Sequence, residues 1–462
     1  MIRGRLAWAV RGRGRVLALS RTVLRVGCRL RSPSLVAFAW SLGTGPIEHH
    51  VVDERPPRRP AGARDRRPGR IVLLPKAGGS EDFRDAADTA GADDGLELCG
   101  LPRDHVRAVF EAIVGEDAFP SLTDTDYRVG DTTFAPAKER YRRFLVRVVR
   151  RYARRLRAVG FVTSNLSFRA ERELAAACVE AGVGFVALHK ESIRTSAQRH
   201  FFTRAYAELL GPFEGSALGV YNADERTSIL ESSMAPEERV QVVGCPRMDP
   251  LHRIREQRAG QRPSADAPVV LFAIDEKAGT WTPYDGREDT HAPRWERLAA
   301  LTDEAFVAAA RSMPERRFVI KVKIGREAQQ LARLPDDPPV NLYVVSSGIG
   351  TALLEEAAVV IGFNSTVLLE ALAVGAPTLV PRYAEAADPA AGDWLFDLSG
   401  AVEEIHALEE LAPAISRALG RGPSEGLSGD AVAALERYVG NADGRASARA
   451  WAFLREAFSR DR

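Results

Sequence analysis

The chain has 462 residues, enough for two or three domains, and its apolar content of 45% with 27% charged residues is ordinary for a folded globular protein. A formal net charge of only +2 argues against a nucleic-acid-binding polycation, so no nucleic-acid partner is expected. The four cysteines are widely spaced and form no CxxC pair, which argues against a zinc site or a disulfide framework and favours a cytoplasmic location.

The N-terminal segment is strongly basic, with nine arginines and no acid in residues 1–31. Arginines and Pro33 interrupt its apolar runs, so neither a transmembrane helix nor a signal peptide is predicted. As a basic amphipathic segment it favours a peripheral contact with an anionic membrane surface at the inner face of the membrane, and a disordered extension is the alternative. The apolar residues of this segment include Trp8, Leu17, Leu24, Phe38 and Trp40. A Pro- and Arg-rich linker at 53–70 completes a basic N-terminal extension over residues 1–70.

A first α/β domain is predicted over residues 71–257. It begins with a strand at Ile71–Pro75 and the Gly-rich loop Lys76–Ser80, which is a weak signal for a phosphate site. Strands and helices then alternate, and this alternation indicates βαβ units and a parallel sheet. The expected helices are 101–114, 136–159, 167–181, 197–209 and 223–231, and the expected strands are 159–163, 183–188, 217–221 and 239–243.

A linker at 258–268 leads into a second α/β domain over residues 268–440, and a C-terminal helix lies in 441–462. Two Rossmann-like domains facing a cleft predict that ligands bind where the carboxyl ends of the strands meet it. The expected strands are 268–274, 317–323 and 340–345, and the expected helices are 302–312, 325–333 and 350–357.

Residues 359–381 carry the most functional information, since they read as strand, polar loop, helix, glycine stop and strand. Asn364, Ser365 and Thr366 occupy the N-cap region of the helix, where free backbone N–H groups and the helix dipole favour an anion. Glu370, about one turn further in, is within reach of a ribose diol. An ordinary capped βαβ unit is the alternative interpretation.

Four segments of the chain, taken together and in their order along it, resemble surface-carbohydrate (capsule and cell-wall polysaccharide) biosynthesis proteins of the GT-B glycosyltransferase type. The resemblance extends over about residues 160–455 and relates the chain distantly to CDP-glycerol glycerophosphotransferases and to the UDP-N-acetylglucosamine 2-epimerase fold. It implies a bacterial enzyme whose nucleotide-activated donor is held mainly by the C-terminal domain. The four segments are ALHKES (187–192), VGCPRMD (243–249), GFNSTVLLEALAVGAPTLVP (362–381) and YVGNADGRASAR (438–449).

The resemblance also implies a donor site. It places the diphosphate of the donor at the loop 364–366 and the ribose at Glu370. Lys321 and Lys323 end a strand near the same cleft and are expected to neutralise the leaving phosphate, and Arg247 at the domain junction is a further phosphate ligand. Helix N-termini and cations can stabilise a leaving diphosphate, so neither a metal nor a cofactor is expected.

The loop after the strand at 183–188 carries the expected catalytic residues. Lys190 and Glu191 would face the acceptor or the reacting carbon. Glu191 or His189 is the candidate base, and Glu191 is preferred because the Lys190 ammonium would keep it ionised. The alternative is a polar loop without a catalytic role.

Other polar patterns are weaker. The triplet 124–126 has the DxD form of a metal site in glycosyltransferases of another fold, but it precedes any clear strand and is discounted. Asp275 and Glu276 leave a strand of the second domain, and Trp281 and Tyr284 in the long loop that follows are candidates for a lid over the donor.

These features predict a GT-B-like transferase that moves a sugar or a polyol phosphate from a nucleotide sugar or CDP-polyol donor onto a surface-polysaccharide precursor, with a glycan or a lipid-linked acceptor. A sugar-nucleotide 2-epimerase-like enzyme is one alternative, although the C-terminal half, with only His291 and His406, is poor in the required histidines. The other is a non-catalytic scaffold that binds a nucleotide or glycan. Without HExxH or GxSxG, the sequence gives no sign of a zinc protease or a serine hydrolase.

Overall fold

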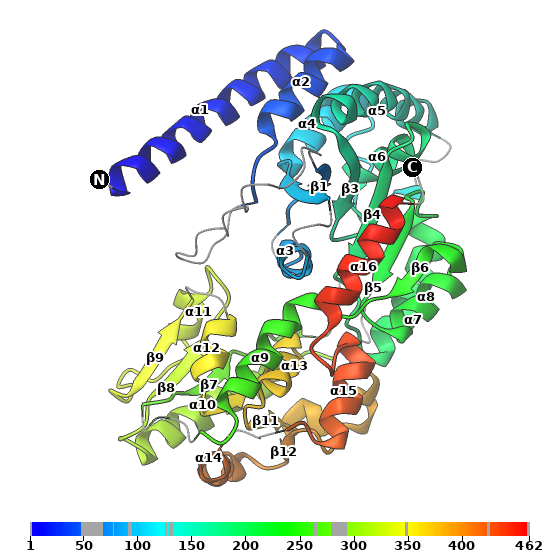
Figure 1. Cartoon of the computed structure of the whole chain (residues 1–462). Helices are drawn as coiled ribbons and strands as arrows, with labels where there is room; N and C mark the ends of the chain where they lie inside the picture. Colours follow the sequence, from blue (N-terminus) through cyan, green and yellow to red (C-terminus); the bar gives the residue numbers. More distant parts are fainter. Residues whose placement is uncertain are drawn as a thin grey trace.

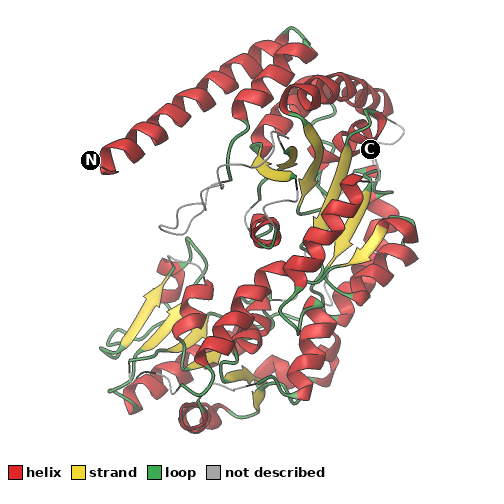
Figure 2. Ribbon diagram, in the orientation of Figure 1, coloured by secondary structure: helices red, strands yellow, loops and turns green. Residues whose placement is uncertain are grey.

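Two parallel six-stranded sheets, each covered by helices, form two α/β domains (Figures 1 and 2). This confirms the predicted α/β class with two Rossmann-like domains. The computed structural model describes residues 2–47, 68–76, 78–90, 95–124, 127–128, 133–261, 264, 266–278, 293–346, 350–422 and 426–459, with side chains from residue 13 onward.

The N-terminal sheet has the strand order β2-β1-β3-β4-β5-β6, with parallel pairing throughout. Its middle strand β4 is buried along its whole length, as expected of a parallel sheet that is covered on both faces. The elements of this domain are α1 (Ile2–Arg29), α2 (Pro33–Gly43), β1 (Gly69–Leu73), α3 (Ser80–Asp88), β2 (Leu96–Gly100), α4 (Arg103–Val114), α5 (Ala135–Leu156), β3 (Ala158–Thr163), α6 (Arg169–Glu180), β4 (Gly184–His189), α7 (Ser196–Ala205), β5 (Ala217–Val220), α8 (Ala223–Glu231) and β6 (Val240–Val242).

The C-terminal sheet has the strand order β12-β11-β10-β7-β8-β9, again parallel. The predicted unit at 359–381 is present: Ser365 caps helix α13, and Gly375, with a φ of 75°, ends it. The elements of this domain are β7 (Val269–Phe272), α10 (Glu296–Ser312), β8 (Phe318–Lys321), α11 (Glu327–Leu331), β9 (Leu342–Val345), α12 (Gly350–Glu356), β10 (Val359–Ile361), α13 (Thr366–Val374), β11 (Thr378–Pro381), β12 (Glu403–Ile405), α14 (Leu411–Arg421) and α15 (Gly429–Val439).

Two helices join the domains. Helix α9 (Asp249–Arg258) leaves the N-terminal sheet and packs on α13, where Arg255 donates to the carbonyl of Ala373 at 3.2 Å. Helix α16 (Ala446–Ser459) returns from the C-terminal domain and lies against the N-terminal sheet (Figure 1). Asp249, buried at the junction, accepts hydrogen bonds from the backbone N–H groups of Ala446 and Ser447 and so caps α16.

The N-terminal helices pack on the first domain. Trp40 of α2 is fully buried, edge-on to Tyr152 and Phe161, so it is not available to a membrane surface as the sequence had suggested. Leu24 of α1 is buried as well. None of the helices in the described ranges combines the length and the apolarity that crossing a membrane requires.

Candidate functional site

The loops after four strands of the N-terminal sheet meet around the start of α3, beside the domain junction. The loops follow β1, β3, β4 and β6, and the carboxyl ends of parallel strands are where α/β folds bind ligands. Helix α13 of the C-terminal domain lies next to α9 on the other side of this junction. We refer to Gly78, Gly79, Ser164, Lys190 and Arg247 as the junction site.

Arg247 is anchored at the junction by a buried polar network. One guanidinium nitrogen, Nη1, donates to the carbonyl of Gly78 at 3.0 Å and to the Tyr221 hydroxyl at 2.8 Å, and lies 3.4 Å from Asp82 Oδ2. The Tyr221 hydroxyl donates to Asp82, and both residues are fully buried. Burial raises the pKa of the Asp82 carboxyl, and the positive charge of Arg247 opposes that rise. The Arg247 side chain nevertheless keeps 22% of its surface exposed, so its charge can act on a ligand.

The turn before α3 requires glycine because other groups crowd against it. A Cβ on Gly79 would lie 2.3 Å from Ser164 Cβ and 2.6 Å from Ser164 Oγ. A Cβ on Gly78, whose φ is +76°, would lie 3.4 Å from the ammonium nitrogen of Lys190. Two glycines therefore let the backbone at the start of α3 approach the serine and the lysine closely.

The start of α3 has the properties of an anion site. Its N-cap is Gly79, which has no side chain to cap the first turn. The N–H of Ser80 donates to the carbonyl of Lys76 at 3.0 Å, and Glu81 and Asp82 also lie in this turn. Ser164 is fully buried, and its hydroxyl has no hydrogen-bond partner among the residues that the structure describes. A positive helix end, the charges of Lys190 and Arg247 and this hydroxyl together suit a phosphate group.

Glu370 is the predicted site residue of the C-terminal domain whose carboxyl is affected by the charge of Arg247. It lies on α13, where burial raises its pKa and the charge of Arg247 opposes that rise. Of the predicted site residues, the structure brings Lys190 and Arg247 to the same turn.

Glu191 lies next to this group, on the loop after β4. Its carboxylate is half exposed and 3.3 Å from the Lys190 ammonium. A carboxylate that reaches solvent beside a cation is free to accept a proton from a bound hydroxyl.

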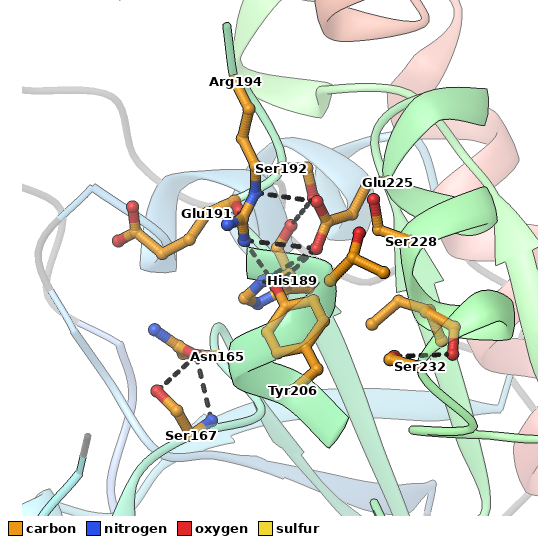
Figure 3. A network of polar contacts seen from close by, with 12 residues as sticks. Asn165, Ser167, His189, Glu191, Ser192, Arg194, Tyr206, Glu225, Ser228 and Ser232 are labelled. Atoms are coloured by element: carbon orange, nitrogen blue, oxygen red, sulfur yellow. Dashed lines mark hydrogen bonds and ion pairs between the residues drawn. The ribbon is translucent and has the colours of Figure 1, made fainter. Parts of the chain in front are cut away.

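His189 is buried at the end of β4, among Tyr206, Arg194 and Glu225 (Figure 3). Its Nε2 is 3.0 Å from the Tyr206 hydroxyl and 3.4 Å from the buried carboxylate of Glu225. The Arg194 guanidinium forms an ion pair with the Glu225 carboxylate at 2.8 Å. Burial raises the pKa of Glu225, but the interactions with Arg194 and His189 outweigh burial and hold this pKa below its usual value. With 2% of its surface exposed, His189 supports the loop rather than touching a substrate.

Two of the three donor residues predicted where α13 begins, Asn364 and Ser365, are hydrogen-bonded within their own domain. The Asn364 amide donates to the carbonyl of Trp394 at 2.7 Å and accepts from the backbone N–H of Phe396 at 3.2 Å. The Ser365 hydroxyl accepts from the backbone N–H of Val367 at 3.4 Å. Thr366 opens α13 and is partly exposed.

The two predicted lysines at the end of β8 lie two strands from β10. Lys321 donates to the carbonyls of Val322 and Ser346, and burial lowers its pKa. Lys323 is largely exposed and pairs with Asp275 at 2.9 Å. Among the described residues, neither lysine forms a hydrogen bond or an ion pair with the junction site.

The structure describes only part of the remaining polar patterns. Asp124 accepts from the backbone N–H of Arg169 at 2.7 Å at the start of α6, while the other two residues of the triplet, Trp281, Tyr284 and His291 lie outside the described residues. Within the described ranges, no group of three or more His, Cys, Asp or Glu side chains is placed to hold a metal.

Sequence reasoning missed Asp82, Ser164 and Tyr221. The Gly-rich loop at 76–80 was a weak sequence signal for the junction site. Nothing in the sequence, however, connects this loop with the residues that complete the site, which lie about 85 to 170 positions further along the chain.

Several solved structures are similar to this chain in shape. They include the UDP-GlcNAc 2-epimerase of Neisseria meningitidis bound to UDP-GlcNAc (10% identity, 85% of this chain and 100% of that chain, TM-score 0.47). The wall teichoic acid polymerase TagF soaked with CDPG (10% identity, 96% and 97%, TM-score 0.46) and an α,α-trehalose-phosphate synthase (UDP-forming) of Burkholderia vietnamiensis (13% identity, 85% and 98%, TM-score 0.44) are also similar.

These are the kinds of fold neighbour that the sequence resemblance predicts. With identities of 10–13% and TM-scores below 0.5, none of them assigns a reaction or a substrate to this chain. No family model and no curated protein sequence matches it.

Proposed function

We propose that this protein is a GT-B-like transferase that moves a sugar or a polyol phosphate from a nucleotide-activated donor onto a surface-polysaccharide precursor. The observation that carries the proposal is the junction site, where a helix start without a side-chain cap, two cations and a buried unpartnered hydroxyl meet in the N-terminal domain, beside the domain junction. Transfer from such a donor needs a place for the phosphates that leave, and these groups supply one.

The proposed reaction assigns a role to each group. An acceptor hydroxyl attacks the reacting carbon or phosphorus and gives its proton to Glu191. The bond to the leaving nucleoside diphosphate, or nucleoside monophosphate for a polyol phosphate, breaks as the acceptor bond forms. Lys190 and Arg247 compensate the negative charge that develops on the leaving group, in a partly buried site where such charges act strongly.

The C-terminal domain contributes the nucleoside contact in this proposal. Glu370, whose carboxyl is influenced by the charge of Arg247, accepts from the ribose hydroxyls, and the backbone at Asn364–Thr366, where α13 begins, approaches the donor. Lys321 and Lys323 are assigned a secondary part, because they already bind groups of their own domain.

The test is product analysis with purified protein. Panels of nucleotide sugars and CDP-polyols are incubated with glycan and lipid-linked acceptors, and the products are identified by mass spectrometry. Lys190→Gln and Glu191→Gln are each expected to lower kcat at least 100-fold, while Arg317→Gln, which removes a surface cation paired with Glu356, keeps the wild-type rate.

Two outcomes would contradict the transferase. An epimerised sugar nucleotide without transfer would favour a 2-epimerase-like enzyme. Tight nucleotide binding without any product across the panel would favour a non-catalytic scaffold.

A further inference from the structure

Helix α1 exposes an apolar stripe, most of whose side chains reach solvent. The rotation of the helix is fixed by its buried side, where the Ser20 hydroxyl donates to the carbonyl of Ala39 at 3.0 Å and Leu24 is 3% exposed. Gly27 lies on the same side, since a Cβ there would come within 3.0 Å of Leu35.

The stripe lies on a different side of the helix. It consists of Val16, Leu19, Val26 and Leu30, which are 42%, 53%, 45% and 68% exposed, with the partly exposed Val23 between them. The steps of three and four residues place all five on one side of an α-helix, over a length of about 21 Å. Of the ten large apolar side chains exposed in the described part of the chain, three therefore lie on α1 and a fourth, Leu30, directly follows it.

Arginines flank this stripe. Arg15, Arg25 and Arg29 are exposed on the helical surface next to it, on the side away from the packed face. The sequence has no acidic residue before Glu48. An apolar stripe with a purely basic flank is the pattern of a helix that lies on an anionic lipid surface.

The shape of the molecule allows such a contact. Figures 1 and 2 show α1 at the outer edge of the N-terminal domain, packed on α2, and the side chains of the stripe are exposed there. A second copy of the chain is a poorer occupant, because two basic flanks of the same sign would face each other.

We propose that α1 docks the protein on an anionic membrane surface through the stripe Val16–Leu30. The apolar side chains enter the boundary between headgroups and acyl chains, and the arginines contact the phosphates of the lipids. The face differs from the one that the sequence suggested, since Leu24 and Trp40 are buried in the protein. This inference does not depend on the proposed reaction.

The test is sedimentation of the full chain with vesicles of phosphatidylcholine alone or with 30 mol% phosphatidylglycerol. The wild-type protein is expected to bind the anionic vesicles at least 10-fold more strongly than the neutral ones. The double variant Leu19→Glu/Leu30→Glu should lose at least 10-fold in binding and should melt as the wild type does, because both side chains are more than half exposed.

Two further variants separate the contributions. Arg25→Gln/Arg29→Gln should weaken binding to anionic vesicles by about five-fold per arginine. Val340→Glu, which changes an apolar side chain that is 93% exposed in the C-terminal domain, should leave binding unchanged.

Unchanged sedimentation of the Leu19→Glu/Leu30→Glu variant would overturn the proposal, and so would equal binding to both kinds of vesicle. Concentration-dependent dimers that disappear in the same variant, without vesicle binding by the wild type, would instead identify the stripe as an interface between copies.

Discussion

Replacing Gly79 by alanine tests the close packing on which the junction site depends. The φ of Gly79 is −131°, which an L-residue can adopt, so the backbone itself opposes the change little. The added Cβ, however, would lie 2.3 Å from Ser164 Cβ and 2.6 Å from Ser164 Oγ, and Ser164 is fully buried. The start of α3 or the end of β3 must therefore move.

Overpacking of this kind costs about 1–3 kcal/mol of the free energy of unfolding. For a domain of this size, the melting temperature should fall by about 2–4 °C per kcal/mol. Because the turn also brings α3 to the cations, Gly79→Ala should weaken phosphate binding as well as stability.

A double-mutant cycle isolates the contact. Ser164→Gly removes both atoms that the new Cβ would meet, so Gly79→Ala/Ser164→Gly should be more stable than the sum of the two single changes predicts, by about 1 kcal/mol or more. The assay is urea unfolding followed by circular dichroism on the four proteins. An alanine variant as stable as the wild type, or two changes that simply add, would refute the proposed packing of Ser164 on this turn.

Three other predictions concern stability and metal dependence. Trp40→Ala should lower the free energy of unfolding by about 3–5 kcal/mol in urea titrations, because its ring is fully buried, whereas a detachable N-terminal extension would leave stability unchanged. Burial raises the pKa of Asp303 to about 6, so this group makes the protein less stable as pH rises from about 4 to about 6; Asp303→Asn should remove that slope, and an identical pH profile of unfolding would contradict the assignment. Transfer activity should survive EDTA, because Lys190 and Arg247 are proposed to carry the phosphate charge, and loss of activity restored by a divalent cation would contradict this role.

The fold was predictable from the sequence where local signals agreed with each other. In the unit at 359–381, a buried strand, a capping serine and a stop glycine all point to one structure, and β10, α13 and β11 follow it closely. The short elements β2, α3 and β12 were missed, since segments of three to nine residues carry little periodicity. The longer helices α9, α14 and α15 were not predicted either.

The candidate site was predictable only in part. Lys190 stood out as a lysine at a strand end and Arg247 as a phosphate ligand implied by the resemblance, and the structure brings them to the same turn. His189 was misleading because the last residue of a fully buried strand looks like a loop residue from the sequence alone. Asp82 and Ser164 belong to the site through tertiary packing, which no spacing along the chain reveals.

The most direct test of the central claim is isothermal titration calorimetry with UDP, CDP, GDP, TDP and inorganic phosphate. The wild-type protein is expected to bind one nucleotide selectively. Lys190→Gln and Ser164→Ala should each weaken that binding about ten-fold or more, while Arg317→Gln binds as the wild type does. Equal affinity in all four proteins, or no binding of any nucleotide, would contradict a phosphate site at the start of α3.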